Sequence, residues 1–273
     1  MSVHRSSRLR KGAPAAAFVC CLAGFPMFAQ GDELPTKSGS EVGVSVSGYK
    51  YDEPGLAAIK ATKIGFDYSG TYALDSQFPS RNKGWFLRGD ARYATGKADY
   101  SSPISGTINN RPDWYYEVRG LVGKDFFLGE YTLSPYAGLG YRYLFNDIRG
   151  VSSTGAAGYR RESTYFTLPV GVTHKMALSN QSKLLSTVEF SYLLRGRQES
   201  KLSDASPANA DVSNRQRNGY GLRLGAMVQF PTWSVGPSLV VWRIKESDRV
   251  GPTAVFEPRN NTVEFGLKAA YSF

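Results

Sequence analysis

Cysteine and histidine are almost absent from this chain. Both cysteines, Cys20 and Cys21, lie in an apolar run near the amino terminus, and of the two histidines only His174 lies beyond that region. A mature chain without cysteine forms neither disulfides nor thiolate metal sites, and it can do no thiol chemistry. The sequence also has no phosphate-cradling glycine loop, nucleotide motif or metal-ligand motif, so it predicts no cofactor.

A hydrophobic run long enough for a membrane-spanning helix is missing as well. The apolar stretch at residues 13–28 contains Gly24 and Pro26, and it is shorter than the roughly 20 residues that a spanning helix needs. Four basic residues precede it and Ala29 follows it, which is the layout of a secretory signal that is cleaved at or near Ala29. This layout divides the chain into a signal peptide at residues 1–29, a periplasmic lead at residues 30–40 and a folded domain at residues 41–273.

What the chain does contain is a period-two alternation of apolar and polar residues. In the last stretch, residues 261–273, every second side chain from Val263 to Phe273 is apolar or aromatic, whereas Glu264 and Lys268 lie between them. This period indicates a strand with one face towards hydrocarbon and the other towards a polar interior. The same pattern predicts ten strands in all, at residues 41–51, 61–73, 83–95, 112–124, 131–145, 163–174, 183–198, 218–230, 233–245 and 261–273.

The predicted connections alternate in length. Those after the fourth, sixth and eighth strands are short, and one link, residues 74–82, is too long for its side. The longer connections are those at residues 52–60, 96–111, 146–162, 199–217 and 246–260. Long loops at one end and short turns at the other are typical of outer-membrane barrels. The predicted fold class is all-β: a single antiparallel transmembrane β-barrel of about ten strands, or of eight or twelve if one hairpin is misread.

Two segments carry a resemblance to a known group of proteins. LSPYAGLGYRY at residues 133–143 and the terminal AAYSF at residues 269–273 resemble strands of the broad OmpA-like and porin-like group of bacterial outer-membrane barrels. The resemblance implies a location in the outer membrane of a Gram-negative bacterium. It also implies that Tyr271 and Phe273 belong to a signal read by the barrel assembly machinery. The group includes anchors, adhesins, channels and enzymes, so membership does not choose a function.

Charged residues gather on the faces that are predicted to point into the barrel. The acidic and basic members of this set are Asp67, Asp90, Glu117, Glu189, Glu264, Arg88, Arg92, Arg119, Arg142, Arg195, Arg223 and Lys268. Side chains already fill an eight-stranded barrel, and an unpaired buried charge costs several kcal/mol. We therefore expect these groups to pair and fill the lumen. The competing interpretation is a narrow channel for small solutes that is lined by the arginines and weakly prefers anions.

An enzymatic function has little support in the sequence. Omptin-type surface proteases are ten-stranded barrels that need paired aspartates and an Asp–His couple at the outer rim. Strand direction places His174 near a periplasmic turn, and no aspartate lies two residues before it. Thr173 is the only hydroxyl residue adjacent to it, which disfavours lipid A deacylation. We predict a non-enzymatic barrel that serves envelope structure or surface interaction, with a solute channel as the alternative and a surface protease third.

The net charge bears on possible partners. The full chain has a formal charge of +10, and the four basic residues of the predicted signal leave +6 for the remainder. Export argues against nucleic acid, whereas basic residues at the outer rim, such as Arg243 and Lys245, would meet anionic lipopolysaccharide. The predicted partners are therefore outer-membrane lipid, lipopolysaccharide and the assembly machinery. The polar loops at residues 101–111, 151–161 and 201–217 could bind a surface ligand that the sequence does not identify.

The assembly signal leads to a direct test. Deletion of Phe273 removes the terminal aromatic side chain, so unfolded protein should accumulate in the periplasm. Fractionation with heat-modifiable gel mobility measures the folded barrel in the outer membrane. A normal amount of folded protein there would contradict the assignment.

Overall fold

The structure is a computed structural model that describes residues 33–74, 83–251 and 254–273. The predicted signal peptide, residues 1–29, and nearly all of the link at residues 74–82 lie outside these residues. No helix in the described ranges is both long and apolar enough to cross a membrane. One short 3₁₀ helix, η2 (Leu202–Asp204), follows the eighth strand.

Strands make up almost all of the described chain. In order they are β1 (Gly39–Glu53), β2 (Ala57–Ala73), β3 (Trp85–Ser102), β4 (Gly106–Lys124), β5 (Phe126–Leu128), β6 (Tyr131–Val151), β7 (Ala157–Ser179), β8 (Ser182–Lys201), β9 (Val212–Gln216), β10 (Gly219–Gln229), β11 (Trp233–Ile244) and β12 (Asn260–Ser272). Both β9 and β10 pair with β8, one after the other, and β5 pairs only with β6. The circuit therefore has ten strand positions.

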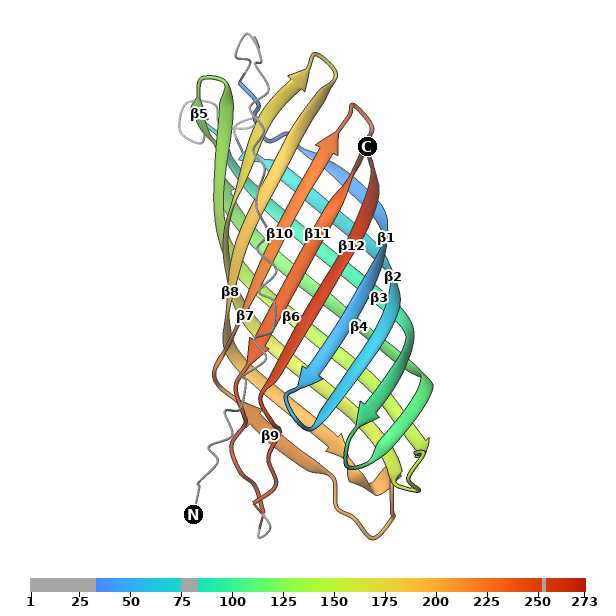
Figure 1. Ribbon diagram of the computed structural model, residues 1–273. Helices are drawn as coiled ribbons and strands as arrows, with labels where there is room; N and C mark the ends of the chain where they lie inside the picture. Colours follow the sequence, from blue (N-terminus) through green and yellow to red (C-terminus); the bar gives the residue numbers. More distant parts are fainter. Residues whose placement is uncertain (1–32, 75–82, 252–253) are drawn as a thin grey trace, which may run out of the picture.

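The sheet closes on itself. β1 pairs antiparallel with β12 from Glu41 opposite Ser272 to Asp52 opposite Asn261. Figure 1 shows the strands tilted around one barrel, with the C-terminus and β5 at one end and β9 at the other. Closure gives each of the ten strand positions a neighbour on both sides, so the backbone groups are paired without water, as a membrane requires. The predicted all-β antiparallel barrel of ten strands is confirmed.

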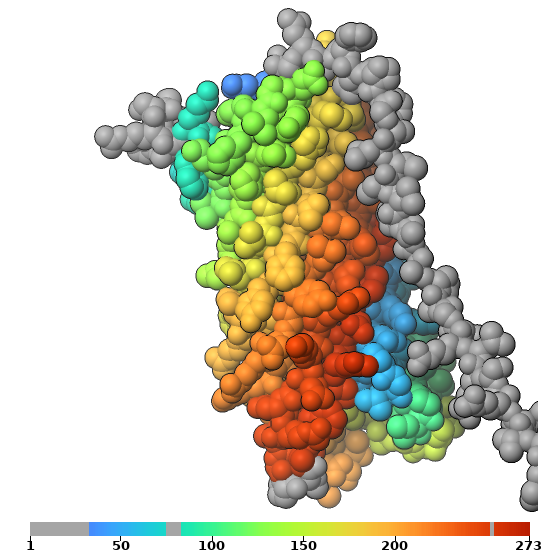
Figure 2. All heavy atoms as spheres, turned by 60° about the vertical axis from the view of Figure 1, so that its left-hand side comes forward, coloured from blue at the N-terminus to red at the C-terminus, as the bar shows by residue number. Residues whose placement is uncertain are grey.

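The outer face of the barrel carries an apolar band. Val44 and Val46 on β1 are 54% and 59% exposed, and Leu267 on β12 is 61% exposed. Aromatic side chains join the band, and the rings of Trp114 and Phe145 stack with their centroids 5.1 Å apart. Figure 2 shows the wall that β8, β10 and β11 build on one side of the barrel. A surface with so many exposed apolar side chains suits hydrocarbon rather than water.

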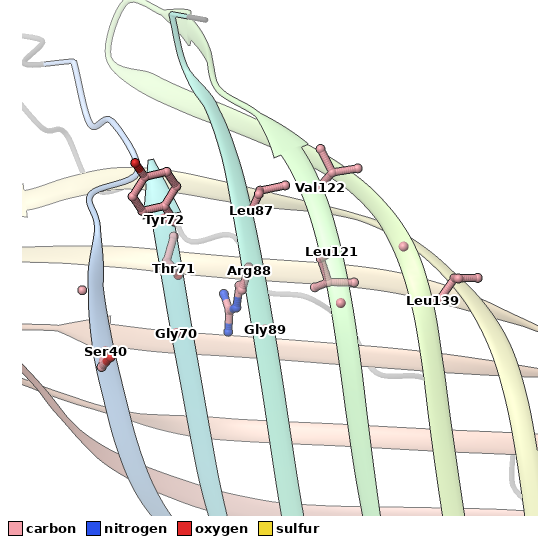
Figure 3. A pocket seen from close by; sticks show the side chains of 13 residues that line it. Ser40, Gly70, Thr71, Tyr72, Leu87, Arg88, Gly89, Leu121, Val122 and Leu139 are labelled. Carbon is pink, nitrogen blue, oxygen red and sulfur yellow. The ribbon is translucent and has the colours of Figure 1, made fainter. Parts of the chain in front are cut away.

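A groove crosses the outer face where β2, β3 and β4 lie side by side. Gly70, Gly89 and Gly120 are paired in register and form its floor, and its volume is about 800 Å³. A Cβ added at Gly89 or Gly120 would meet nothing within 4 Å, so the groove exists because side chains are missing there. Leu87 and Val122 line its edge (Figure 3). Because these two side chains belong to the apolar band, the groove opens towards lipid.

The strands extend further than predicted at the end away from the C-terminus. Residues 57–60, 96–102 and 106–111, which we expected in loops, belong to β2, β3 and β4. The expected loop at residues 199–217 likewise contains η2 and β9. These segments are rich in small and polar residues on both faces and continue past the apolar band, so no alternation marks them as strands. The predicted long loops there are mostly hairpin ends.

A bulge in β8 reverses the facing of Arg195. Phe166 is opposite Arg195, but Thr167 is opposite Leu193, so Leu194 is an extra residue in β8. Leu194 and Arg195 both face outward, and Leu193 faces inward with 0% exposure. The prediction that Arg195 lines the lumen is therefore wrong. A period-two count that runs across an extra residue changes phase, and every later residue is assigned to the opposite face.

Leu193 packs in a small apolar cluster inside the barrel with Tyr165, Trp242 and Ile244. Replacing it in Leu193→Ala should lower the free energy of unfolding by about 2–5 kcal/mol, because the closed interior cannot collapse onto the cavity. The neighbouring change Leu194→Ala should cost clearly less, since lipid fills the space outside. Urea unfolding in lipid vesicles, followed by tryptophan fluorescence, compares the two variants. Equal losses would contradict the bulge.

Candidate functional site in the barrel lumen

The inward charges form ion pairs that run through the lumen. At the centre, Arg92 on β3 lies 2.9 Å from Asp67 on β2 and 2.8 Å from Glu264 on β12. The Arg92 Nε donates to the hydroxyl oxygen of Tyr115 at 2.8 Å, and Tyr115 in turn donates to Glu264 at 2.7 Å. Ser47 donates a further hydrogen bond to Glu264 at 2.8 Å. Strands that are distant in sequence thus meet around one guanidinium group.

A second group of pairs lies nearer the C-terminal end of the barrel. Arg119 on β4 bonds Glu189 on β8 at 2.7 Å and Asp90 on β3 at 2.6 Å. Asp90 also accepts from Arg88 at 2.7 Å, and Glu189 accepts from the Tyr136 hydroxyl at 2.9 Å. Since β4 and β8 are not neighbours in the sheet, the Arg119–Glu189 pair crosses the interior.

Glu117 joins these two groups. Its carboxylate lies 2.5 Å from Arg223 on β10, 3.6 Å from Arg119 and 3.9 Å from Arg142 on β6. The Arg142 guanidinium also lies over the ring of Tyr115, 4.3 Å from its centroid, which is a cation–π contact. One carboxylate therefore stands among three arginines. A buried charge is tolerated when it has such partners.

Our set of predicted lumen charges omitted the most deeply buried one. Lys63 on β2 has 0% exposure, and its ammonium group pairs with Asp113 on β4 beneath the rings of Tyr49 and Tyr115. The alternation could have identified it, because Lys63 shares a strand face with Asp67. Asp113 likewise alternates with the outward Trp114, so the same pattern directs its side chain into the lumen.

Further ionic clusters occupy the two ends of the lumen. At the end away from the C-terminus, Arg161 on β7 pairs with Glu53 on β1 at 2.5 Å and with Glu257 in the connection before β12. Burial raises the pKa of Glu257 above its ordinary value. At the C-terminal end, Lys175 on β7 pairs with Asp125 at 2.9 Å. The backbone N–H of Thr36 donates to Asp125 at 2.5 Å, so the described part of the predicted lead lies against the lumen.

One small cavity lies among the ion pairs. A cavity towards the end of the lumen away from the C-terminus, lined by Tyr49, Asp113 and Gln198 among others, measures about 30 Å³. That volume is close to the share of one water molecule. Apart from Arg195, which faces outward, the arginines expected to line a passage have carboxylates in contact. In chemical terms the arrangement holds charge in place.

The remaining predicted residues lie outside this network or at its edge. Lys268 pairs with Glu41 at 3.1 Å near the C-terminal end of the lumen. Tyr271 and Phe273 are exposed on the outer face, with their ring centroids 6.3 Å apart. The His174 ring lies 5.2 Å from that of Tyr131. In the ranges that the structure describes, no group of three or more His, Cys, Asp or Glu residues could hold a metal ion.

Glu117 offers a test of the network. Replacing it in Glu117→Leu leaves Arg223 and its neighbours without their shared carboxylate, and breaking a buried pair costs about 3–5 kcal/mol. The temperature at which the folded band disappears on heat-modifiable gels should fall. The control Glu199→Leu removes a partly exposed carboxylate near the outer end of β8 and should change this temperature little. Unchanged melting of the Glu117 variant would contradict the pairing.

Comparisons with known proteins were made for the sequence and for the fold. A search of curated protein sequences found no match. Among solved structures, the translocator domain of the autotransporter NalP from Neisseria meningitidis is similar at 14% identity and a TM-score of 0.47, over 87% of this chain and 90% of that one. The transport unit of the autotransporter AIDA-I from Escherichia coli is similar at 12% identity and a TM-score of 0.42, over 87% of this chain and 91% of that one. A major outer membrane protein from Thermus thermophilus is similar at 13% identity and a TM-score of 0.40, over 86% of this chain and 99% of that one.

A family model also matches the chain. The model for the autotransporter beta-domain covers residues 42–238, which run from β1 into β11. The expected outer-membrane barrel in a bacterium is thereby confirmed, while the narrower resemblance to the OmpA-like and porin-like group stays a prediction. The chain belongs to the autotransporter beta-domain family.

Proposed function

We propose that this protein is a non-enzymatic outer-membrane barrel whose lumen is closed by its own charged side chains. It would act in envelope structure or through contacts at its outer surface. The observation that carries the proposal is the chain of ion pairs from Lys175–Asp125 at one end to Arg161–Glu53 at the other. Between them lie the pairs of Arg119, Arg92 and Lys63.

Opening this lumen would require several pairs to separate together. Each pair is buried or nearly so, and the charge left behind by a lost partner is costly in a low-dielectric interior. A barrel of ten strands is only modestly wider than one of eight, which side chains fill completely. A solute or an extended polypeptide would therefore have to displace the network rather than pass beside it. This argues against a constitutive porin-like channel and against a translocation path that stands open.

The outer end of the barrel is better placed for function than the lumen. Its hairpins continue past the apolar band. Arg160 on β7 holds η2 against the barrel by donating a hydrogen bond to Asp204 at 2.7 Å. This hydrogen bond lowers the pKa of Asp204, which keeps the carboxylate charged. Ordered polar hairpins at a cell surface present side chains to the medium.

Planar-bilayer recording of the refolded protein tests the closed lumen. The wild type should give no steady openings while heat-modifiable mobility demonstrates that it is folded. The fourfold variant Arg92→Ala, Glu264→Ala, Arg119→Ala and Glu189→Ala removes two central pairs and should conduct. Discrete, reproducible openings of the folded wild type would overturn the proposal and favour the small-solute channel.

The matched control removes two exposed pairs instead. The variant Lys50→Ala, Asp52→Ala, Arg197→Ala and Glu199→Ala also loses two positive and two negative charges. It should stay silent, because these side chains lie at the outer hairpins. Conductance in the control would mean that the current does not report on the lumen.

A further inference from the structure

Six basic side chains gather on the outside of the barrel just beyond the apolar band. All six are exposed, and they lie on β8, on or next to β9, and on or next to β11. We call this set the outer basic patch: Arg195, Arg197, Arg215, Arg217, Arg243 and Lys245. On β8 the band ends at Leu194, directly before Arg195, and on β11 the outward Val241 precedes Arg243. The patch therefore begins where hydrocarbon contact stops.

The strand register brings these residues together. Arg197 on β8 is directly opposite Arg215 on β9. Lys245 donates its backbone N–H to the carbonyl of Asn218, next to Arg217, and Arg243 is opposite Tyr220. The bulge that turns Arg195 outward adds a further cation to this surface. Like charges directly across strands destabilise a sheet unless something negative lies between them.

Acidic partners are scarce in the outer basic patch. Of the six patch residues, only Arg197 has a carboxylate of the described chain in ion-pair contact, that of Glu199 at 2.8 Å. Asp248 is nearby, but its carboxylate accepts the backbone N–H of Arg215 at 2.6 Å. In the lumen, by contrast, Arg88, Arg92, Arg119, Arg142 and Arg223 all contact carboxylates. Five of the six cations of the outer basic patch therefore have no carboxylate in ion-pair contact.

We infer that the outer basic patch binds the phosphate groups of lipid A, the phosphorylated glycolipid of the outer leaflet. In outer-membrane barrels the end away from the start of the first strand and the end of the last strand faces outward. The outer leaflet is therefore the one that adjoins the patch. Guanidinium groups match phosphate oxygens in a bidentate geometry, and Arg supplies five of the six side chains. Neighbouring strands are about 4.8 Å apart, so three strand positions span roughly 10 Å. That width suits a disaccharide headgroup with two phosphates better than a single phosphate.

The apolar side chains below the patch complete the fit. Phe190 on β8 and Tyr220 on β10 stack with ring centroids 5.8 Å apart, and both are exposed to the membrane. The Tyr220 hydroxyl accepts from Arg243 at 3.4 Å, so aromatic ring and cation share one position at the interface. Acyl chains would lie against the rings while the phosphates meet the cations. This surface is outside the lumen, so the inference holds whether or not the barrel conducts.

Native mass spectrometry of the full folded barrel in detergent tests the inference with purified bis-phosphorylated lipid A as the probe. The variant Arg195→Gln, Arg217→Gln and Lys245→Gln should bind lipid A roughly 100-fold more weakly, since each basic residue near an anionic membrane surface contributes about a factor of five. The control Lys37→Gln, Lys83→Gln and Lys124→Gln removes the same charge at the periplasmic end and should bind as the wild type does. Heat-modifiable mobility verifies that every variant is folded.

Two further lipids separate this binding from general attraction to anions. Lipid A with one phosphate should bind more weakly than the bis-phosphorylated form, and phosphatidylglycerol should not displace it at equal concentration. Equal binding by the patch variant and the wild type would overturn the inference. So would effective competition by phosphatidylglycerol, or an equal loss in the periplasmic control.

Discussion

Pairing of charges inside a membrane is the constraint on which this barrel depends. Its lumen contains arginines, lysines and carboxylates at positions where water is nearly excluded. The desolvation cost of each charge would be prohibitive without a partner. Arg92, Arg119 and Glu117 each contact more than one partner, so the cost is distributed across the whole interior. The partners come from strands on different sides of the barrel. The ionic network therefore ties the walls together as an apolar core does in a water-soluble domain.

The alternation of side chains made much of this architecture predictable from the sequence. The ten barrel strands and the outward face of β1 and β12 follow from a period of two, because lipid and lumen impose opposite demands on alternate residues. The same count placed Glu117 and Glu264 inside. It said nothing about which charges meet, since a pair such as Arg119–Glu189 depends on how the sheet curves across the barrel.

Three features escaped the sequence for identifiable reasons. The bulge at Leu194 inserts one residue without changing the local composition, so the facing of Arg195 could be seen only in the register. The outer ends of β2, β3 and β4 meet water on both faces and have no apolar side to reveal them. The contact of Thr36 with Asp125 joins residues 89 positions apart, and no local pattern encodes such a pair.

The position of Glu264 has a consequence for how the barrel is assembled. It lies on β12, the last strand in the chain, while its partner Arg92 lies on β3. An open sheet that lacks β12 would expose Arg92 without this carboxylate and would also leave the edge of β1 unpaired. Docking of the final strand removes both penalties in a single event. Neutralisation and closure are thus thermodynamically coupled, which disfavours a partly closed intermediate within the bilayer and makes the last step of assembly cooperative.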